Sequence, residues 1–178
     1  VLMVNLNHSY SEKPKGAQAL GDFSMEGRTE RVVEFLNGGE VNDTAYFDWI
    51  YVPVDVTLEL KQANHVLFFS RTDGDGFIEF DTQKEQLDIE FDELMPGVST
   101  LNMHTSDNVK TLSFWAAGGK PGDVTEAKVT LGSAHGLDLI SLGHVQASTK
   151  MDLDLSQADV GGSVTVSVIG ADTIRITG

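Results

Sequence analysis

Cysteine is absent from this 178-residue chain, and proline is scarce, with four residues against eighteen glycines. The lack of cysteine excludes disulfide frameworks, catalytic thiols and cysteine-ligated zinc. Abundant glycine indicates many tight turns. No apolar run approaches the roughly 18 residues of a transmembrane helix, and no basic segment precedes an apolar stretch near the N-terminus, so no signal peptide is expected.

Positively charged residues are also few: the chain has 12 Lys and Arg residues and 27 Asp and Glu residues, which gives a net charge of −15. An acidic field of this size repels phosphate backbones and anionic lipid, so we expect neither nucleic-acid binding nor membrane binding. Apolar residues make up 40 % of the chain, which is typical of a globular protein. The sequence therefore predicts an acidic, soluble protein.

Alternation of apolar and polar residues recurs along most of the chain and indicates strands with one face in the core and one in water. His65–Ser70 is a continuous apolar run, as in a central strand. Turn residues separate these segments, and no repeat of about 20 to 50 residues is evident. We therefore expect an all-β fold, an antiparallel β-sandwich of jelly-roll type. The alternating segments are Val54–Leu60, Leu87–Asp92, Ala127–Leu131, Met151–Leu155, Ser163–Val168 and Thr173–Thr177.

Residues 1–30 lack this periodicity. We interpret them as an extended N-terminal arm, with a short strand at Val1–Leu6, and residues 31–178 as a single β-sandwich domain. Arg31–Leu36 fits either a strand or one helical turn. Nothing after Val52 carries a helical stripe, which favours the all-β class.

The segment Asp73-Gly-Asp-Gly-Phe-Ile-Glu-Phe80 resembles the middle of an EF-hand calcium loop. In that alignment Arg71 and Thr82 stand where the family needs an aspartate and a bidentate glutamate. The sequence favours a β-hairpin whose Asp-Gly pair supplies a positive φ. Asp73, Asp75 and Glu79 are the weak candidates for a cation, and we expect no metal or other cofactor.

The segment Gln86-Leu-Asp-Ile-Glu-Phe91 resembles the active-site strand of the laminarinase and lichenase family of retaining β-glucanases, which is written Glu-Ile-Asp-Ile-Glu-Phe. Asp88 matches the central aspartate of that motif, and Glu90 matches the acid/base. Gln86 stands at the position of the nucleophile, where an amide cannot form the glycosyl ester. The match covers six residues and implies, at most, a degenerate glucanase.

No other catalytic set is evident. The chain lacks the Gly-x-Ser-x-Gly elbow of hydrolases and a phosphate-binding loop. Its histidines show no close spacing of the kind that ligand pairs have; they are His8, His65, His104, His135 and His144. We therefore expect a protein that is not an enzyme, with no catalytic residues.

Aromatic residues are the candidates for partner contacts. Trp49 and Tyr51 share one face of their segment, opposite Ile50, while Phe114 and Trp115 point to opposite faces. Most of these aromatics fit a core. If exposed, Trp49, Tyr51 and Trp115 would form a sugar-stacking platform or a subunit contact.

Three functions remain open. The first is a structural or assembly protein that forms a homo-oligomer, a homotrimer, through its arm and sheet edges. The specific protein of this class that we expect is a virion component, such as a capsid-decorating or tail subunit, which would be located in the virion. The second is a carbohydrate-binding, lectin-like module. The third is the degenerate glucanase. The first rests on the habit of jelly rolls to build symmetric shells.

Overall fold

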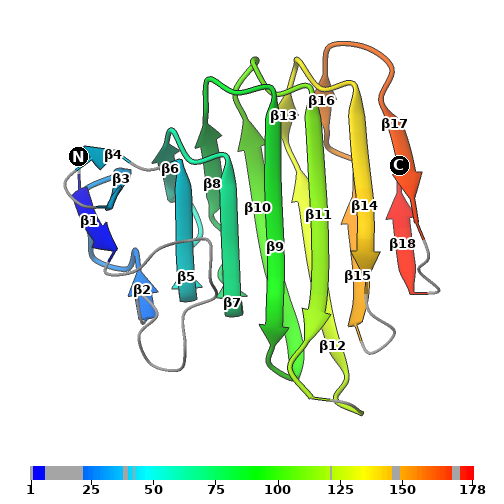
Figure 1. Ribbon diagram of the computed structural model, residues 1–178, viewed down its shortest axis with the longest axis horizontal. Coiled ribbons are helices and arrows are strands. Elements are labelled where there is room, and N and C mark those ends of the chain that lie inside the picture. The colour runs from blue at the N-terminus through cyan, green and yellow to red at the C-terminus, as the bar shows by residue number, and fades with distance from the viewer. Residues whose placement is uncertain are drawn as a thin grey trace.

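The computed structural model describes residues 2–6, 22–37, 40–41, 43–120, 122–145, 149–169 and 173–178. Within these ranges every regular element is a β-strand, and most strands lie in two large sheets that face each other (Figure 1). The first strands lie at one end of the long axis, and the last strands lie at the other end. The all-β prediction is confirmed.

Among the described residues the first large sheet, sheet A, has nine strands and the second, sheet B, has seven. A two-stranded sheet C lies at one corner. Sheet A consists of β1 (Leu2–Leu6), β3 (Val32–Asn37), β4 (Glu40–Val41), β6 (Thr57–Lys61), β8 (Phe77–Asp81), β10 (Gly97–Thr105), β12 (Thr125–Leu131), β15 (Thr149–Asp154) and β18 (Ile174–Thr177). Sheet B consists of β2 (Asp22–Ser24), β5 (Thr44–Tyr51), β7 (His65–Asp73), β9 (Gln86–Leu94), β11 (Thr111–Gly118), β14 (Leu139–Val145) and β17 (Thr165–Val168). Sheet C pairs β13 (Ser133–Ala134) with β16 (Asp159–Val160).

The chain winds as a parallel β-solenoid of about six turns. It passes from β6 in sheet A to β7 in sheet B, then to β8 in sheet A and β9 in sheet B, so that each strand pairs with the strand one turn away. Register partners are therefore distant in sequence: Thr57 pairs with Phe77, 20 residues on, and Gly97 pairs with Thr125, 28 residues on. Apart from the short antiparallel pair of β3 and β4, the described strand pairs are parallel.

The prediction of an antiparallel sandwich of jelly-roll type is wrong. Both folds give each strand one buried face and one wet face, so alternation in the sequence is the same in both. The virion component rested on the habits of jelly rolls, and neither the fold nor any other finding supports it. The structure repeats from turn to turn, but the repeat is hard to see in the sequence, because the turns vary in length and many positions carry different residues in successive turns.

The core lies between sheets A and B. Inward-facing residues form rows that run from turn to turn, and one aromatic row is formed by Phe47, Phe68 and Phe91, which are register partners and fully buried. The ring centroids of Phe47 and Phe68 are 5.8 Å apart, and those of Phe68 and Phe91 are 5.5 Å apart. Stacked rings of this kind stabilise neighbouring turns beyond their burial alone.

Most of the strands expected from alternation are confirmed. Leu87, Ile89 and Phe91 face the core, as predicted. The segment from Arg31 forms a strand, β3, and the short N-terminal strand corresponds to β1. Val54 is an exception, because it lies in a turn before β6 and is 63 % exposed.

The Asp73–Gly76 turn is a corner between the two sheets and not a hairpin, because β7 belongs to sheet B and β8 to sheet A. The predicted positive φ is present at Gly74, at 97°. A Cβ at Gly74 would stand 2.0 Å from the carbonyl oxygen of Val52. Only glycine fits this corner, because the backbone of the preceding turn passes so close to it.

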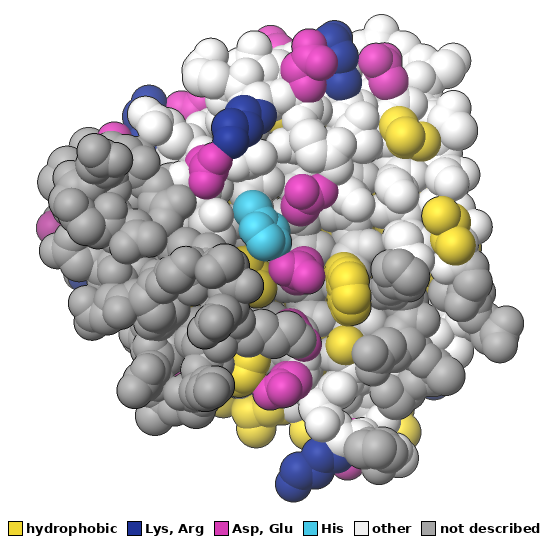
Figure 2. All heavy atoms as spheres, viewed as in Figure 1, with side chains coloured by type: hydrophobic (Ala, Val, Ile, Leu, Met, Phe, Trp, Pro, Cys, Tyr) yellow, Lys and Arg dark blue, Asp and Glu magenta, His cyan; other side chains and the backbone are white. Residues whose placement is uncertain are grey.

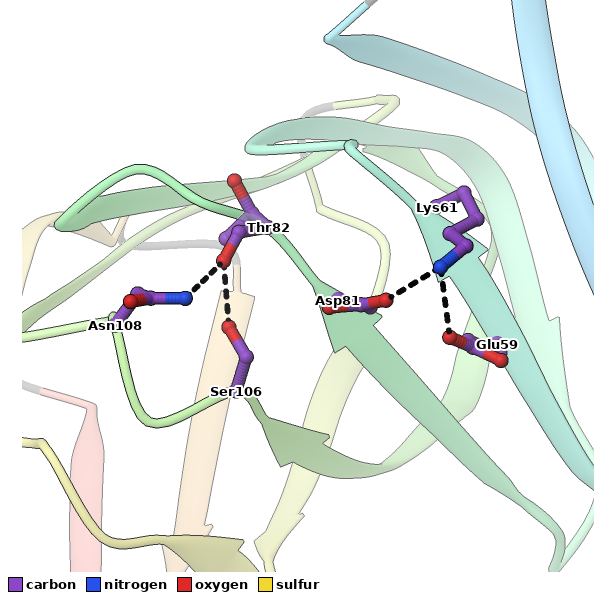
Figure 3. Close-up of polar contacts among 6 residues, drawn as sticks. All are labelled: Glu59, Lys61, Asp81, Thr82, Ser106 and Asn108. Atoms are coloured by element: carbon purple, nitrogen blue, oxygen red, sulfur yellow. Dashed lines mark hydrogen bonds and ion pairs between the residues drawn. The ribbon is translucent and has the colours of Figure 1, made fainter.

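Polar side chains join successive turns at the corners (Figure 3). Lys61 on β6 donates a hydrogen bond to Asp81 on β8, at 3.1 Å, and lies 3.8 Å from Glu59. Burial, aided by a hydrogen bond with Asp81, raises the pKa of Glu59. At the next corner the carbonyl of Thr82 accepts hydrogen bonds from the Ser106 hydroxyl at 2.7 Å and from the Asn108 amide at 3.3 Å.

Two described segments of residues 1–30 belong to the sheets. Strand β1 pairs with β3 in sheet A, and β2 pairs with β5 in sheet B. The division into an arm and a domain at residue 30 stays a prediction, because the remainder of that segment lies outside the described residues.

Candidate functional site

A groove of about 200 Å³ lies on the outer face of sheet B (Figure 2). It crosses the adjacent strands β7, β9, β11 and β14. Acidic side chains, a histidine and apolar side chains are grouped on this face in Figure 2. The described residues that line the groove are His65, Asp88, Ile89, Glu90, Ser113, Phe114, Trp115 and Gly143.

Strand periodicity places these side chains. In β9 the residues Leu87, Ile89 and Phe91 face the core, so Asp88 and Glu90 point outward. Asp88 is the register partner of His65 on one side and of Ser113 on the other. The parallel register therefore assembles polar groups that are up to 48 positions apart in the sequence into one row.

An imidazole–carboxylate pair forms one part of the groove. The His65 Nε2 atom lies 2.8 Å from Oε2 of Glu90, and the hydrogen bond to Glu90 raises the pKa of His65 although burial opposes this. A second carboxylate, Asp88, accepts a hydrogen bond from the Gln86 amide at 2.7 Å. These contacts hold both carboxylates in fixed positions on the face of the sheet.

Trp115 and Gly143 form the apolar part of the groove. The Trp115 side chain is 41 % exposed, whereas its neighbour Phe114 is buried in the core, so the predicted opposite orientation of the two residues is confirmed. Gly143 lies at an irregularity between β11 and β14, where Phe114 pairs with Leu142 and Trp115 with His144. A Cβ at Gly143 would meet nothing within 4 Å, so the missing side chain leaves the space beside the indole open.

The resemblance to the glucanase strand can now be placed. Gln86, Asp88 and Glu90 lie on the outer face of β9, and Asp88 and Glu90 line the groove. Gln86, at the nucleophile position of that motif, donates to Asp88 and is exposed at the start of the strand. The groove thus contains carboxylates at the positions of the aspartate and the acid/base, but an amide at the position of the nucleophile.

The three aromatic candidates are not brought together. Trp49 and Tyr51 lie on β5, half-buried and opposite the buried Ile50, as predicted. The Arg71 guanidinium lies 5.3 Å from the centre of the Trp49 ring. Strands β7 and β9 separate β5 from β11, so Trp115 alone of the three lines the groove.

The cation candidates are also dispersed. Asp73 lies at the end of β7 in sheet B, where it pairs with Arg71 at 3.1 Å. Asp75 is exposed in the corner, and Glu79 faces outward from sheet A. Among the described residues no group of three or more His, Cys, Asp or Glu side chains is placed to hold a metal ion.

Two further histidines join neighbouring turns. The His104 ring stacks on Phe77 at 4.3 Å, and its Nδ1 atom accepts a hydrogen bond from the Ser133 amide; burial lowers the pKa of His104. His135 pairs with Asp159 at 2.8 Å and with Asp107 at 3.4 Å, and the hydrogen bond to Asp159 raises its pKa. The side chains of His8 and His144 lie outside the described residues.

Sequence reasoning missed His65, Ser113 and Gly143 as parts of a site. Each stands at an outward position of a strand, and a turn length of 20 to 28 residues is the signal that would have aligned them. That signal is weak in the sequence because the turns vary in length and the outward row changes from His65 to Asp88 to Ser113 in successive turns.

Comparisons of the chain with models of protein families, with curated proteins and with solved structures find no match. Within the described ranges no helix has the length and apolar character to cross a membrane. The groove on sheet B is therefore interpreted from its own geometry and chemistry.

Proposed function

We propose that the protein binds carbohydrate through the groove on sheet B, as a glycan-binding β-solenoid. The observation that carries this proposal is the partly exposed indole of Trp115 beside the open space at Gly143 and the carboxylates Asp88 and Glu90. An aromatic ring offers a flat apolar surface for the C–H face of a sugar ring, and carboxylates accept hydrogen bonds from its hydroxyls.

The rigidity of the groove favours the interpretation that it is a binding site and not an ordinary polar surface. Its side chains stand on strands in the middle of sheet B, and contacts with His65 and Gln86 fix the two carboxylates. A site held on regular elements loses little conformational entropy when a ligand binds. This is the arrangement expected of a recognition surface.

The exposed area of the Trp115 indole determines how much free energy it contributes to glycan binding. An indole offers about 250 Å², so an exposed fraction of 41 % corresponds to about 100 Å². Covering half of this area, as one sugar face does, contributes about 1.3 kcal/mol at about 25 cal/mol/Å². Replacing Trp115 by alanine should therefore weaken binding about tenfold.

The test is a panel of immobilised neutral, acidic and amino-sugar glycans, followed by titration of the glycans that bind. Trp115→Ala should reduce affinity about tenfold or more, while Trp49→Ala serves as a matched control because Trp49 lies on β5, outside the groove lining. Equal binding by wild type and Trp115→Ala, or no binding to any glycan, would refute the proposal.

Self-association, the assembly function without its virion form, stays a second candidate. Among the described residues of the last turn, the exposed large apolar side chains are Val168, Ile169 and Ile176. Edge strands with apolar neighbours are surfaces on which chains pair. Light scattering of the full chain tests this candidate: a trimer or another stable oligomer would support it, and a monomer throughout the micromolar range would contradict it.

A further inference from the structure

The groove is longer across the strands than along them. Its lining residues come from four adjacent strands, from His65 on β7 to Gly143 on β14. Three steps between neighbouring strands cover about 14 Å, whereas the two residues from Asp88 to Glu90 cover about 7 Å along β9. The long dimension of the groove therefore runs parallel to the axis of the solenoid.

Hydrogen-bonding side chains repeat along the same direction. Asp88, Ser113 and Ser141 are successive register partners on β9, β11 and β14, and Ser167 on β17 continues the row. Each step along this row is one strand spacing, about 4.8 Å, which is close to the length of one pyranose unit in an extended glycan. A linear chain lying on this row would meet one polar side chain for each of its sugar units.

The charges in the groove select against anions. Its ionisable lining residues are His65, Asp88 and Glu90, and among the described lining residues none is Lys or Arg. The chain as a whole carries a net charge of −15, so uronic acids and sulfated sugars meet repulsion. Glu90 lies beside the His65 imidazole, and Asp88 accepts a hydrogen bond from the Gln86 amide, so each carboxylate has a hydrogen-bonding partner within the protein and does not need a cationic ligand.

We infer that the ligand is an uncharged, linear oligosaccharide that lies across β7, β9, β11 and β14, parallel to the solenoid axis. This inference rests on the proposed function, since it names the class and the orientation of the glycan. It excludes acidic polysaccharides, and it excludes monosaccharide ligands that would fill only the space beside Trp115.

Calorimetric titration with chain-length series tests the class of ligand. The probes are neutral oligomers of glucose, xylose and mannose from monosaccharide to hexasaccharide, with oligogalacturonate as the anionic series and chitosan oligomers as the cationic one. Affinity should rise with length in one neutral series, by at least about tenfold, and level off once the oligomer spans the four strands. Binding of that series should not change with salt, because no charge is neutralised.

Two matched leucine variants test the orientation. Gly143→Leu places a side chain in the groove at the β14 end; Gly143 has room for it and no left-handed φ. Thr111→Leu adds the same side chain to the outer face of β11, along the strand from Trp115 and outside the groove lining. Gly143→Leu should reduce hexasaccharide affinity by about tenfold or more, while Thr111→Leu leaves it unchanged.

The outcomes separate this inference from the proposed function. Binding that depends on Trp115 but favours anionic or cationic oligomers, or that is as tight for a monosaccharide as for a hexasaccharide, overturns the inference and leaves glycan binding intact. Loss of hexasaccharide binding in Thr111→Leu with no effect of Gly143→Leu overturns the orientation. Failure of every glycan to bind removes both.

Discussion

The row of stacked rings in the core makes Phe68 the residue whose truncation should cost the solenoid most. Phe68 is fully buried between Phe47 and Phe91, with centroid distances of 5.8 and 5.5 Å. A buried Phe→Ala change costs about 3 to 5 kcal/mol, and two ring contacts place Phe68→Ala toward the upper part of that range. We expect a loss of about 4 kcal/mol in the free energy of unfolding.

Urea unfolding followed by tryptophan fluorescence measures this loss. With a slope of about 2 kcal/mol per molar urea, 4 kcal/mol lowers the midpoint by about 2 M. A loss of this size is a large part of the stability of a domain, so Phe68→Ala could fail to fold. Phe68→Leu is therefore a milder second variant, with an expected loss of about 1 to 2 kcal/mol in the free energy of unfolding.

The neighbouring residue supplies the control. Phe69 points to the outer face, is half-buried, and lies with its ring centroid 5.8 Å from that of Tyr46. Phe69→Ala should cost about 1 to 2 kcal/mol, at most about half the cost of Phe68→Ala. Equal losses for the two variants, or a loss below about 2 kcal/mol for Phe68→Ala, would show that the inward row of rings does not join the turns as described.

Two further predictions concern pH and the corners of the solenoid. The hydrogen bond to Glu90 raises the pKa of His65 above its usual 6.5, so the contribution of this pair to stability should be complete below pH 6.5 and disappear as the pH rises through the raised pKa. An NMR titration of the imidazole measures the pKa, and unfolding curves on both sides of this range measure the stability. An unchanged pKa of His65 in Glu90→Gln would contradict the assignment. Gly136→Ala should destabilise the protein by about 1 to 3 kcal/mol, because its Cβ would stand 2.0 Å from the carbonyl oxygen of Asp107, whereas Gly143→Ala, with open space around its Cβ, should stay within about 0.5 kcal/mol of wild type.

The orientation of side chains within single strands was predictable from the sequence. Alternation along Leu87–Asp92 placed Leu87, Ile89 and Phe91 in the core. It placed Asp88 and Glu90 on the outer face of the strand, and the structure confirms both assignments. The opposite orientation of Phe114 and Trp115 was predictable for the same reason, since successive residues of a strand point to opposite faces. These inferences need only the local period of two.

The way in which the strands pair was not predictable from that period. Parallel sheets usually need helical crossovers, whereas antiparallel strands are joined by short turns, so short strands separated by turn residues favoured an antiparallel sandwich. In this solenoid each crossover is a strand of the opposite sheet, as β8 connects β7 to β9. Strand length and alternation are the same in the two arrangements, so the local sequence does not distinguish them.

The sequence by itself therefore determined the β class, the inward and outward faces of its strands, and the acidic character of the surface. Only the tertiary structure decided that Asp88 lies between His65 and Ser113, and that Glu90, Trp115 and Gly143 line one groove. The physical reason is that each of these neighbours is set by the register between turns. Register depends on the lengths of the intervening corners and on how unlike side chains pack across the core, and neither is written in the local pattern of any one strand.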